Sequence, residues 1–149
     1  MLELSGKRVL LREFTQSDID DVLAIVGDDR VTCWLSFDIK DLAGATATVD
    51  AARVAADVHP RTEYYLAVQP FTETRLVGFV RLALSGVRAA KLGYAVQAEH
   101  WNHGYATDAA STILEFGFRQ LDLHRVTAAV GPDNYASMAV LTRRLEPWR

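Results

Sequence analysis

The stretch Trp101–Ala109 limits what this chain can fold into more than any other part of the sequence. It joins a strand predicted over Lys91–Val96 to a helix predicted over Tyr105–Leu121. The first N–H groups of a helix have no partner inside the helix and lie at the positive end of its dipole. A tight turn at such a junction therefore forms a binding site for an anion such as phosphate. Gly104 lets the backbone approach the ligand closely, and Ala106 is small for the same reason.

On its own this loop also fits an ordinary tight turn, because short motifs often match by chance. The rest of the chain is needed to decide between the two interpretations. Periodicity and turn residues predict one α/β domain, of the α+β type, over residues 1–149. Strands are expected over Lys7–Phe14, Tyr64–Val68, Leu76–Leu84, Lys91–Val96 and Arg125–Val130, and helices over Thr15–Val26, Thr46–Val58, Tyr105–Leu121 and Tyr135–Leu145.

The connections between these elements predict how the strands pair. Short turns between the three middle strands favour an antiparallel meander. The strand–loop–helix–strand unit over Lys91–Val130 predicts a right-handed crossover between two parallel strands. At the start of the first helix, Thr15 and Asp18 fit an imperfect capping box. We therefore expect a mixed, mostly antiparallel sheet with helices on both faces.

Composition narrows the classes of function. With 50% hydrophobic and 23% charged residues, the chain is typical of a folded globular protein. A net charge of −3 argues against broad binding to nucleic acid, and no apolar run reaches the ~20 residues of a membrane span. The single Cys33 excludes an intrachain disulfide and, without a signal-peptide pattern, predicts a cytoplasmic protein. The four histidines (His59, His100, His103 and His124) do not have the spacing of a metal site, so no metal is expected.

The order of elements and the loop together resemble the GNAT superfamily of acyl-CoA-dependent N-acetyltransferases. The branch that contains the ribosomal-protein N-terminal acetyltransferases is the most similar. Five segments carry the resemblance, in the family's order: Val9–Thr15 with Asp18, Val31–Leu35, Leu76–Val80, Leu92–Val96 with Trp101–Ala109, and Leu123–Val126 with Asn134–Ser137.

The resemblance implies acetyl-CoA as co-substrate. In the family the loop holds the pyrophosphate of CoA, and two splayed parallel strands admit the pantetheine arm. Trp101 stands where the family usually has Arg or Gln. Carried over to this sequence, the cofactor-binding residues would be Tyr94, Ala95, Val96, Trp101, Asn102, His103, Gly104, Tyr105, Ala106, Thr107, Asn134 and Arg143.

The same resemblance implies direct attack of an amine on the thioester. Ser137 would supply a hydroxyl to the leaving sulfur, although it could instead bond its own helix backbone. Asn134 would orient the reacting centre, with a helix N-cap as its alternative role. The general base is open among Glu99, His100 and Glu63, of which Glu99 is our first choice.

The chain departs from the family after its last predicted helix. Where the family continues into two more strands, this sequence reads Glu146-Pro147-Trp148-Arg149, so the sheet is expected to lack its last two strands. The fifth strand would then be an exposed apolar edge, which a second copy in a homodimer or a plug formed by Trp148 would cover. The third alternative is that the tail is a truncation or a reading-frame change that weakens activity and leaves the CoA half intact. The leading hypothesis is acetyl transfer to a small-molecule amine or a protein N-terminus, and the alternative is a non-catalytic acyl-CoA-binding module. The sequence does not identify the acceptor.

Overall fold

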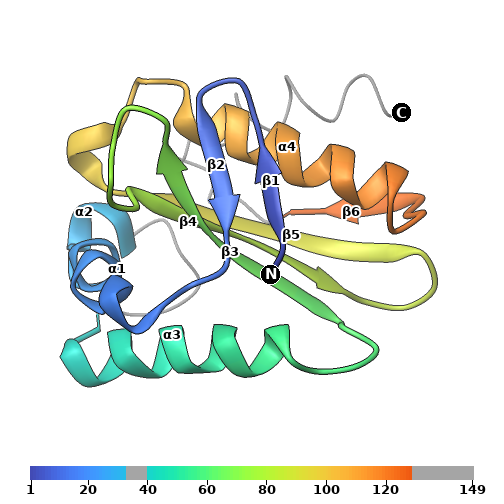
Figure 1. Cartoon of the computed structure of the whole chain (residues 1–149), viewed down its shortest axis with the longest axis horizontal. Coiled ribbons are helices and arrows are strands. Elements are labelled where there is room, and N and C mark those ends of the chain that lie inside the picture. The colour runs from blue at the N-terminus through green and yellow to red at the C-terminus, as the bar shows by residue number, and fades with distance from the viewer. Residues whose placement is uncertain (33–39, 129–149) are drawn as a thin grey trace.

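A computed structural model describes residues 1–32 and 40–128 of the chain. Within them, six strands form one sheet in the order in which they follow along the chain (Figure 1). The strands are β1 (Glu3–Ser5), β2 (Val9–Arg12), β3 (Glu63–Pro70), β4 (Gly78–Leu84), β5 (Ala89–Val96) and β6 (Arg125–Thr127).

Strand pairing follows the prediction from the connections. The pairs β1–β2, β2–β3, β3–β4 and β4–β5 are antiparallel. The pair β5–β6 is parallel, and its register runs from Ala89↔Arg125 to Lys91↔Thr127. Because β5 continues to Val96, its second half extends beyond Lys91, the last of its residues that pairs with β6 in the described part of the chain. Figure 1 shows β5 running past β6 towards the loop that leads into α4.

Helices cover both faces of this sheet, as the sequence predicts (Figure 1). One face packs against α4 (Tyr105–Arg119), whose Ala109, Ala110, Ile113 and Leu114 join a core cluster with residues of β2 to β5. The other face packs against α1 (Ile19–Val26), α2 (Asp29–Thr32) and α3 (Leu42–Ala56). None of the helices described here is long and apolar enough to cross a membrane.

Local hydrogen bonds explain where two helical segments begin. The predicted capping box is present: Thr15 and Asp18 cap the short 3-10 helix η1 (Gln16–Asp18) that leads into α1. Asp18 also accepts two hydrogen bonds of 2.9 Å from the guanidinium of Arg12, which fixes β2 to this corner. The start of α3 is capped by the side chain of Asp41, which accepts from the N–H of Gly44.

Several element boundaries differ from the predictions. The cap at Asp41 makes α3 begin at Leu42 rather than Thr46. The strand predicted over Lys7–Phe14 is the shorter β2, and β1 was not predicted. Strand β1 pairs with β2 through a tight turn, in which the N–H of Gly6 donates to the carbonyl of Val9 at 2.8 Å. The predicted helix over 135–145 and the expected strands beyond it lie outside the described residues.

Candidate functional site

The carboxyl end of β5 presents its peptide groups in two directions. Gln97 N donates to Val77 O at 2.7 Å, and Ser85 N donates to Ala89 O at 2.8 Å. Since the direction of the N–H and C=O groups alternates along a strand, those of the odd-numbered residues of β5 point towards β4. The peptide groups of Tyr94 and Val96 are then directed away from β4, whereas those of Ala95 face Phe79. Of the three β5 residues predicted to bind the cofactor, Tyr94 and Val96 therefore have the required backbone direction.

The loop after β5 folds back on the strand it leaves. It begins with the 3-10 helix η2 (Ala98–His100). The indole N–H of Trp101 then donates to the carbonyl of Val96 at 2.9 Å. Trp101 thus contributes a strut between the strand end and the loop, a role that the sequence did not indicate.

Two residues of this loop have left-handed backbone conformations. Asn102 has φ of 65° and Gly104 has φ of 78°. Asparagine and glycine are the residues that adopt this region at least cost. The reversal at Gly104 turns the chain directly into α4, for which Gly104 is the N-cap residue.

The N-terminus of α4 has the features of an anion site. Its N-cap residue offers no side-chain cap, so the N–H groups of Tyr105, Ala106 and Thr107 point out of the first turn. Asn102, His103 and Gly104 are exposed beside them. These donors and the positive end of a helix of 15 residues fit a diphosphate.

Aromatic rings line one side of the loop. The ring of His103 stacks on Tyr105 with 5.4 Å between centroids and 13° between planes. The ring of His100 lies 6.3 Å from each of these rings. Nδ1 of His103 lies 2.9 Å from the carbonyl oxygen of Trp101, which fixes the imidazole against the loop backbone.

Two residues that sequence reasoning missed connect the loop to the β1–β2 turn. The carboxylate of Asp108, in the first turn of α4, accepts hydrogen bonds from the backbone N–H groups of Lys7, Arg8 and Val9. Nη1 of Arg8 donates to the carbonyl of His103 at 2.9 Å. Asp108 belongs to the stretch Trp101–Ala109, but its hydrogen-bond partners are about a hundred positions away in the sequence, so no local pattern indicates them.

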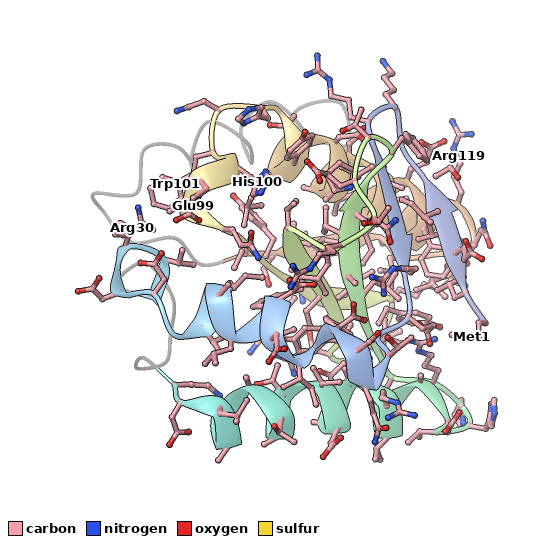
Figure 2. All side chains as sticks on the ribbon, turned by 60° about the vertical axis from the view of Figure 1, so that its left-hand side comes forward. Met1, Arg30, Glu99, His100, Trp101 and Arg119 are labelled. Carbon is pink, nitrogen blue, oxygen red and sulfur yellow. The ribbon has the colours of Figure 1, made fainter. Side chains whose placement is uncertain are left out.

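Glu99 takes part in an exposed ion-pair network rather than standing alone. Arg30 of α2 donates to Glu99 Oε1 at 2.6 Å and to Asp28 Oδ2 at 2.6 Å. Figure 2 shows Arg30 beside Glu99, with Trp101 and His100 following along the chain. The hydrogen bonds from Arg30 lower the pKa of both the Glu99 and the Asp28 carboxyl groups. A lowered pKa makes Glu99 a weaker proton acceptor.

Of the other predicted candidates for the base, His100 lies at the loop and Glu63 does not. Glu63 forms an ion pair with Arg81. It lies across the sheet from Ala83, which lies opposite Lys91, so Glu63 is near the start of β5 and far from Val96. Asn134, Ser137 and Arg143 lie outside the described residues. In the part of the chain that is described, no three His, Cys, Asp or Glu side chains come together as a metal site.

Comparison with known proteins agrees with this arrangement. Residues 8–144 match the family described as "Acetyltransferase (GNAT) domain". The probable N-acetyltransferase YjcK of Bacillus subtilis (strain 168) is 32% identical over 148 residues, which cover 94% of this chain and 81% of that protein.

Solved structures share the fold. A GNAT-family acetyltransferase from Bacillus anthracis superimposes with a TM-score of 0.83 at 22% identity, over 95% of this chain and 81% of that one. RimJ from Mycobacterium smegmatis, solved in complex with CoA-disulfide, gives a TM-score of 0.78 at 23% identity, over 95% of this chain and 73% of RimJ. The chain therefore belongs to the GNAT family of N-acetyltransferases.

Proposed function

We propose that this enzyme transfers an acetyl group from acetyl-CoA to a primary amine by direct attack in a ternary complex. The observation that most supports acetyl-CoA as the acetyl donor is the uncapped N-terminus of α4, which follows a loop with Gly104 at φ of 78°. The N–H groups of Tyr105, Ala106 and Thr107 bind the diphosphate together with the exposed backbone of Asn102 and His103. RimJ, a structural neighbour, is known in complex with CoA-disulfide, which supports the same cofactor here.

The remaining cofactor contacts come from β5. The peptide groups of Tyr94 and Val96, which are directed away from β4, bind the pantetheine arm as a neighbouring strand would. The indole N–H of Trp101 donates to the carbonyl of Val96. The N–H of Val96 is then the group that faces the thioester carbonyl, where it stabilises the negative charge that develops on the thioester oxygen. Ala95 contributes by packing only, since its peptide groups face β4. Asn134 and Arg143 complete the cofactor site in this proposal.

The acetyl thioester of the bound cofactor supplies the group that is transferred. Ser137 donates a proton to the sulfur that leaves, and Asn134 orients the reacting centre. The amine must lose a proton before or during attack, because an alkylammonium has a pKa of about 10.4. Glu99 is the predicted base, but its ion pair with Arg30 keeps it ionised and weakly basic, which favours an electrostatic role towards a cationic amine.

The acceptor is a primary amine of a small molecule or of a protein N-terminus. The exposed carboxylate of Glu99, just after β5, and the partly buried carboxylate of Asp28, before α2, favour a cationic acceptor over a nucleic acid or a membrane surface. We propose a cytoplasmic enzyme, in line with its single cysteine. A homodimer remains the proposed assembly, and gel filtration against standards of known mass tests it.

The first test is calorimetric titration of acetyl-CoA into the wild type and into Gly104→Glu. The substituted side chain carries a negative charge into the loop, so we expect affinity to fall by about a hundredfold or more. If the wild type binds acetyl-CoA and Gly104→Glu binds it equally tightly, the loop does not hold the diphosphate.

The matched control is Gly86→Glu. Gly86 also has a left-handed conformation, with φ of 73°, and a Cβ there meets nothing within 4 Å. It lies in the turn before β5, at the opposite end of that strand from the loop. Gly86→Glu therefore reproduces the added charge and the backbone strain, and it should leave the dissociation constant of acetyl-CoA unchanged. An amine panel with the wild type then identifies the acceptor.

A further inference from the structure

We propose that Asp108 is a positioning residue of the cofactor site, which holds the phosphate loop in its binding conformation by fastening it to the β1–β2 turn. This inference rests on the proposed function, because it assumes that the diphosphate of acetyl-CoA binds at the N-terminus of α4. It assigns a role in cofactor binding to a turn about a hundred residues away in the sequence.

The hydrogen bonds of Asp108 are arranged as a clamp. Its Oδ1 accepts from the N–H of Lys7 at 3.0 Å, and its Oδ2 accepts from the N–H groups of Arg8 at 2.8 Å and Val9 at 3.0 Å. Three amide donors on one carboxylate make a strong, charge-assisted contact. Because Asp108 belongs to the same helical turn as the proposed phosphate donors, this contact fixes the direction in which that turn points.

Arg8 forms the second half of the clamp. With its own N–H bound to Asp108, the Arg8 side chain reaches the loop and donates from Nη1 to the carbonyl of His103. A Cβ built on Gly104 would lie 3.5 Å from the same Nη1, so the guanidinium adjoins the residue at which the loop turns into the helix. Among the described residues, Arg8 makes no other side-chain hydrogen bond, which leaves donors available for a phosphate oxygen.

Two physical effects of Asp108 on the cofactor have opposite signs. As a negative charge one turn from the proposed diphosphate, Asp108 should weaken binding, and its removal should strengthen it. As a clamp it should strengthen binding, since a loop that must be ordered by its ligand binds less tightly. The proposal is that the clamp outweighs the charge.

The test is calorimetry of acetyl-CoA with Asp108→Asn. An amide has the same shape but loses the charge and one acceptor oxygen, so we expect the dissociation constant to rise by about tenfold. We expect kcat at saturating acetyl-CoA to change less than about threefold, because an interaction equal in ground and transition states alters KM alone. Hydrogen exchange of the free protein should show faster exchange at the amides of Lys7, Arg8 and Val9.

Gly6→Ala separates geometry from charge. A Cβ on Gly6 would collide with the Asp108 carboxylate, with Cγ at 2.8 Å and Thr112 Oγ1 at 2.6 Å, and no charge changes. The side chain of Asp108 must then move off the amides, so this variant should also weaken binding. Glu115→Gln is the matched charge control, because Glu115 is an exposed acid of the same helix paired only with Arg119 among the described residues. It should bind acetyl-CoA as the wild type does.

A further control removes stability as an explanation. Val49→Ala shortens a fully buried side chain of α3, on the other face of the sheet, and lowers the melting temperature without touching the loop. It should leave the dissociation constant unchanged. If the wild type binds acetyl-CoA and both Asp108→Asn and Gly6→Ala bind it as tightly or more tightly, the proposed clamp is wrong. A wild type that does not bind acetyl-CoA would instead refute the proposed function.

Discussion

Glu99 illustrates how a neighbouring residue decides what a carboxylate can do. The sequence leaves it as one of three candidate bases, together with His100 and Glu63. Arg30, which is 69 positions away in the chain, donates to it and lowers its pKa below the usual range of a glutamate. Glu99 is therefore ionised at every pH from 6 to 9, roughly speaking, and its own titration produces no limb of a pH profile there.

We predict that Glu99→Gln lowers kcat by less than about tenfold, whereas loss of a working general base typically costs about 10²–10⁴. The limbs of the pH profile of kcat/KM between pH 6 and 9 should stay in place. Steady-state kinetics across that range provide the measurement. Arg30→Gln is the paired variant, since it keeps the Glu99 carboxylate and removes the partner that lowers its pKa, together with the Arg30–Asp28 pair. A loss above a hundredfold in Glu99→Gln alone would restore Glu99 as the base.

At the scale of the element, two glycines of adjacent strands show how closely the sheet packs beside the site. Gly78 of β4 lies opposite Val96, and a Cβ there would collide with the backbone carbonyl of Ala95 and lie 3.1 Å from Val96 Cα. Gly93 of β5 is exposed, and a Cβ there meets nothing within 4 Å. Alanine should therefore have opposite effects at the two positions.

We expect Gly78→Ala to lower the free energy of unfolding by about 1–3 kcal/mol, because backbone atoms of β5 must move. Gly93→Ala should raise it by up to about 1 kcal/mol, because alanine reduces the freedom of the unfolded chain. Urea unfolding of both variants measures the difference. Equal effects at the two positions would contradict the close approach of β4 and β5 at Gly78.

Elements with strong periodicity were predictable, and those set by distant contacts were not. The apolar spacing along residues 105–121 predicted α4 and most of its buried face, and the short turns predicted the antiparallel pairing. The three-residue β1 is too short to show a pattern and exists because it pairs with β2. The loop between β5 and α4 was predictable from its position and its glycine, and its binding of an anion stays a prediction. The hydrogen bonds of Asp108 and Trp101 were not predictable, because they depend on partners that only the folded chain brings near.

At the scale of the whole molecule, the proposed cofactor loop is joined to two distant parts of the fold. The hydrogen bonds of Asp108 connect it to the β1–β2 turn. The ion pair between Glu99 and Arg30 connects the segment just before the loop to α2. These two partners belong to different parts of the described fold: β1 is an edge strand of the sheet, and α2 packs on the face away from α4. A ligand that orders the loop should therefore stabilise the entire domain rather than one segment.

Acetyl-CoA at about 100 times its dissociation constant should add about 2.7 kcal/mol to the free energy of unfolding. For a domain of 149 residues this corresponds to a rise of roughly 5–10 °C in melting temperature. Acetyl-pantetheine carries the same thioester but lacks both the diphosphate and the nucleotide, so at the same concentration it should raise the melting temperature far less if the α4 N-terminus and the nucleotide contacts supply much of the affinity. Thermal denaturation with each compound measures the contrast, and Gly104→Glu should abolish the larger shift. Equal shifts from the two compounds would mean that the strand edge at Tyr94 and Val96, rather than the loop, dominates cofactor binding.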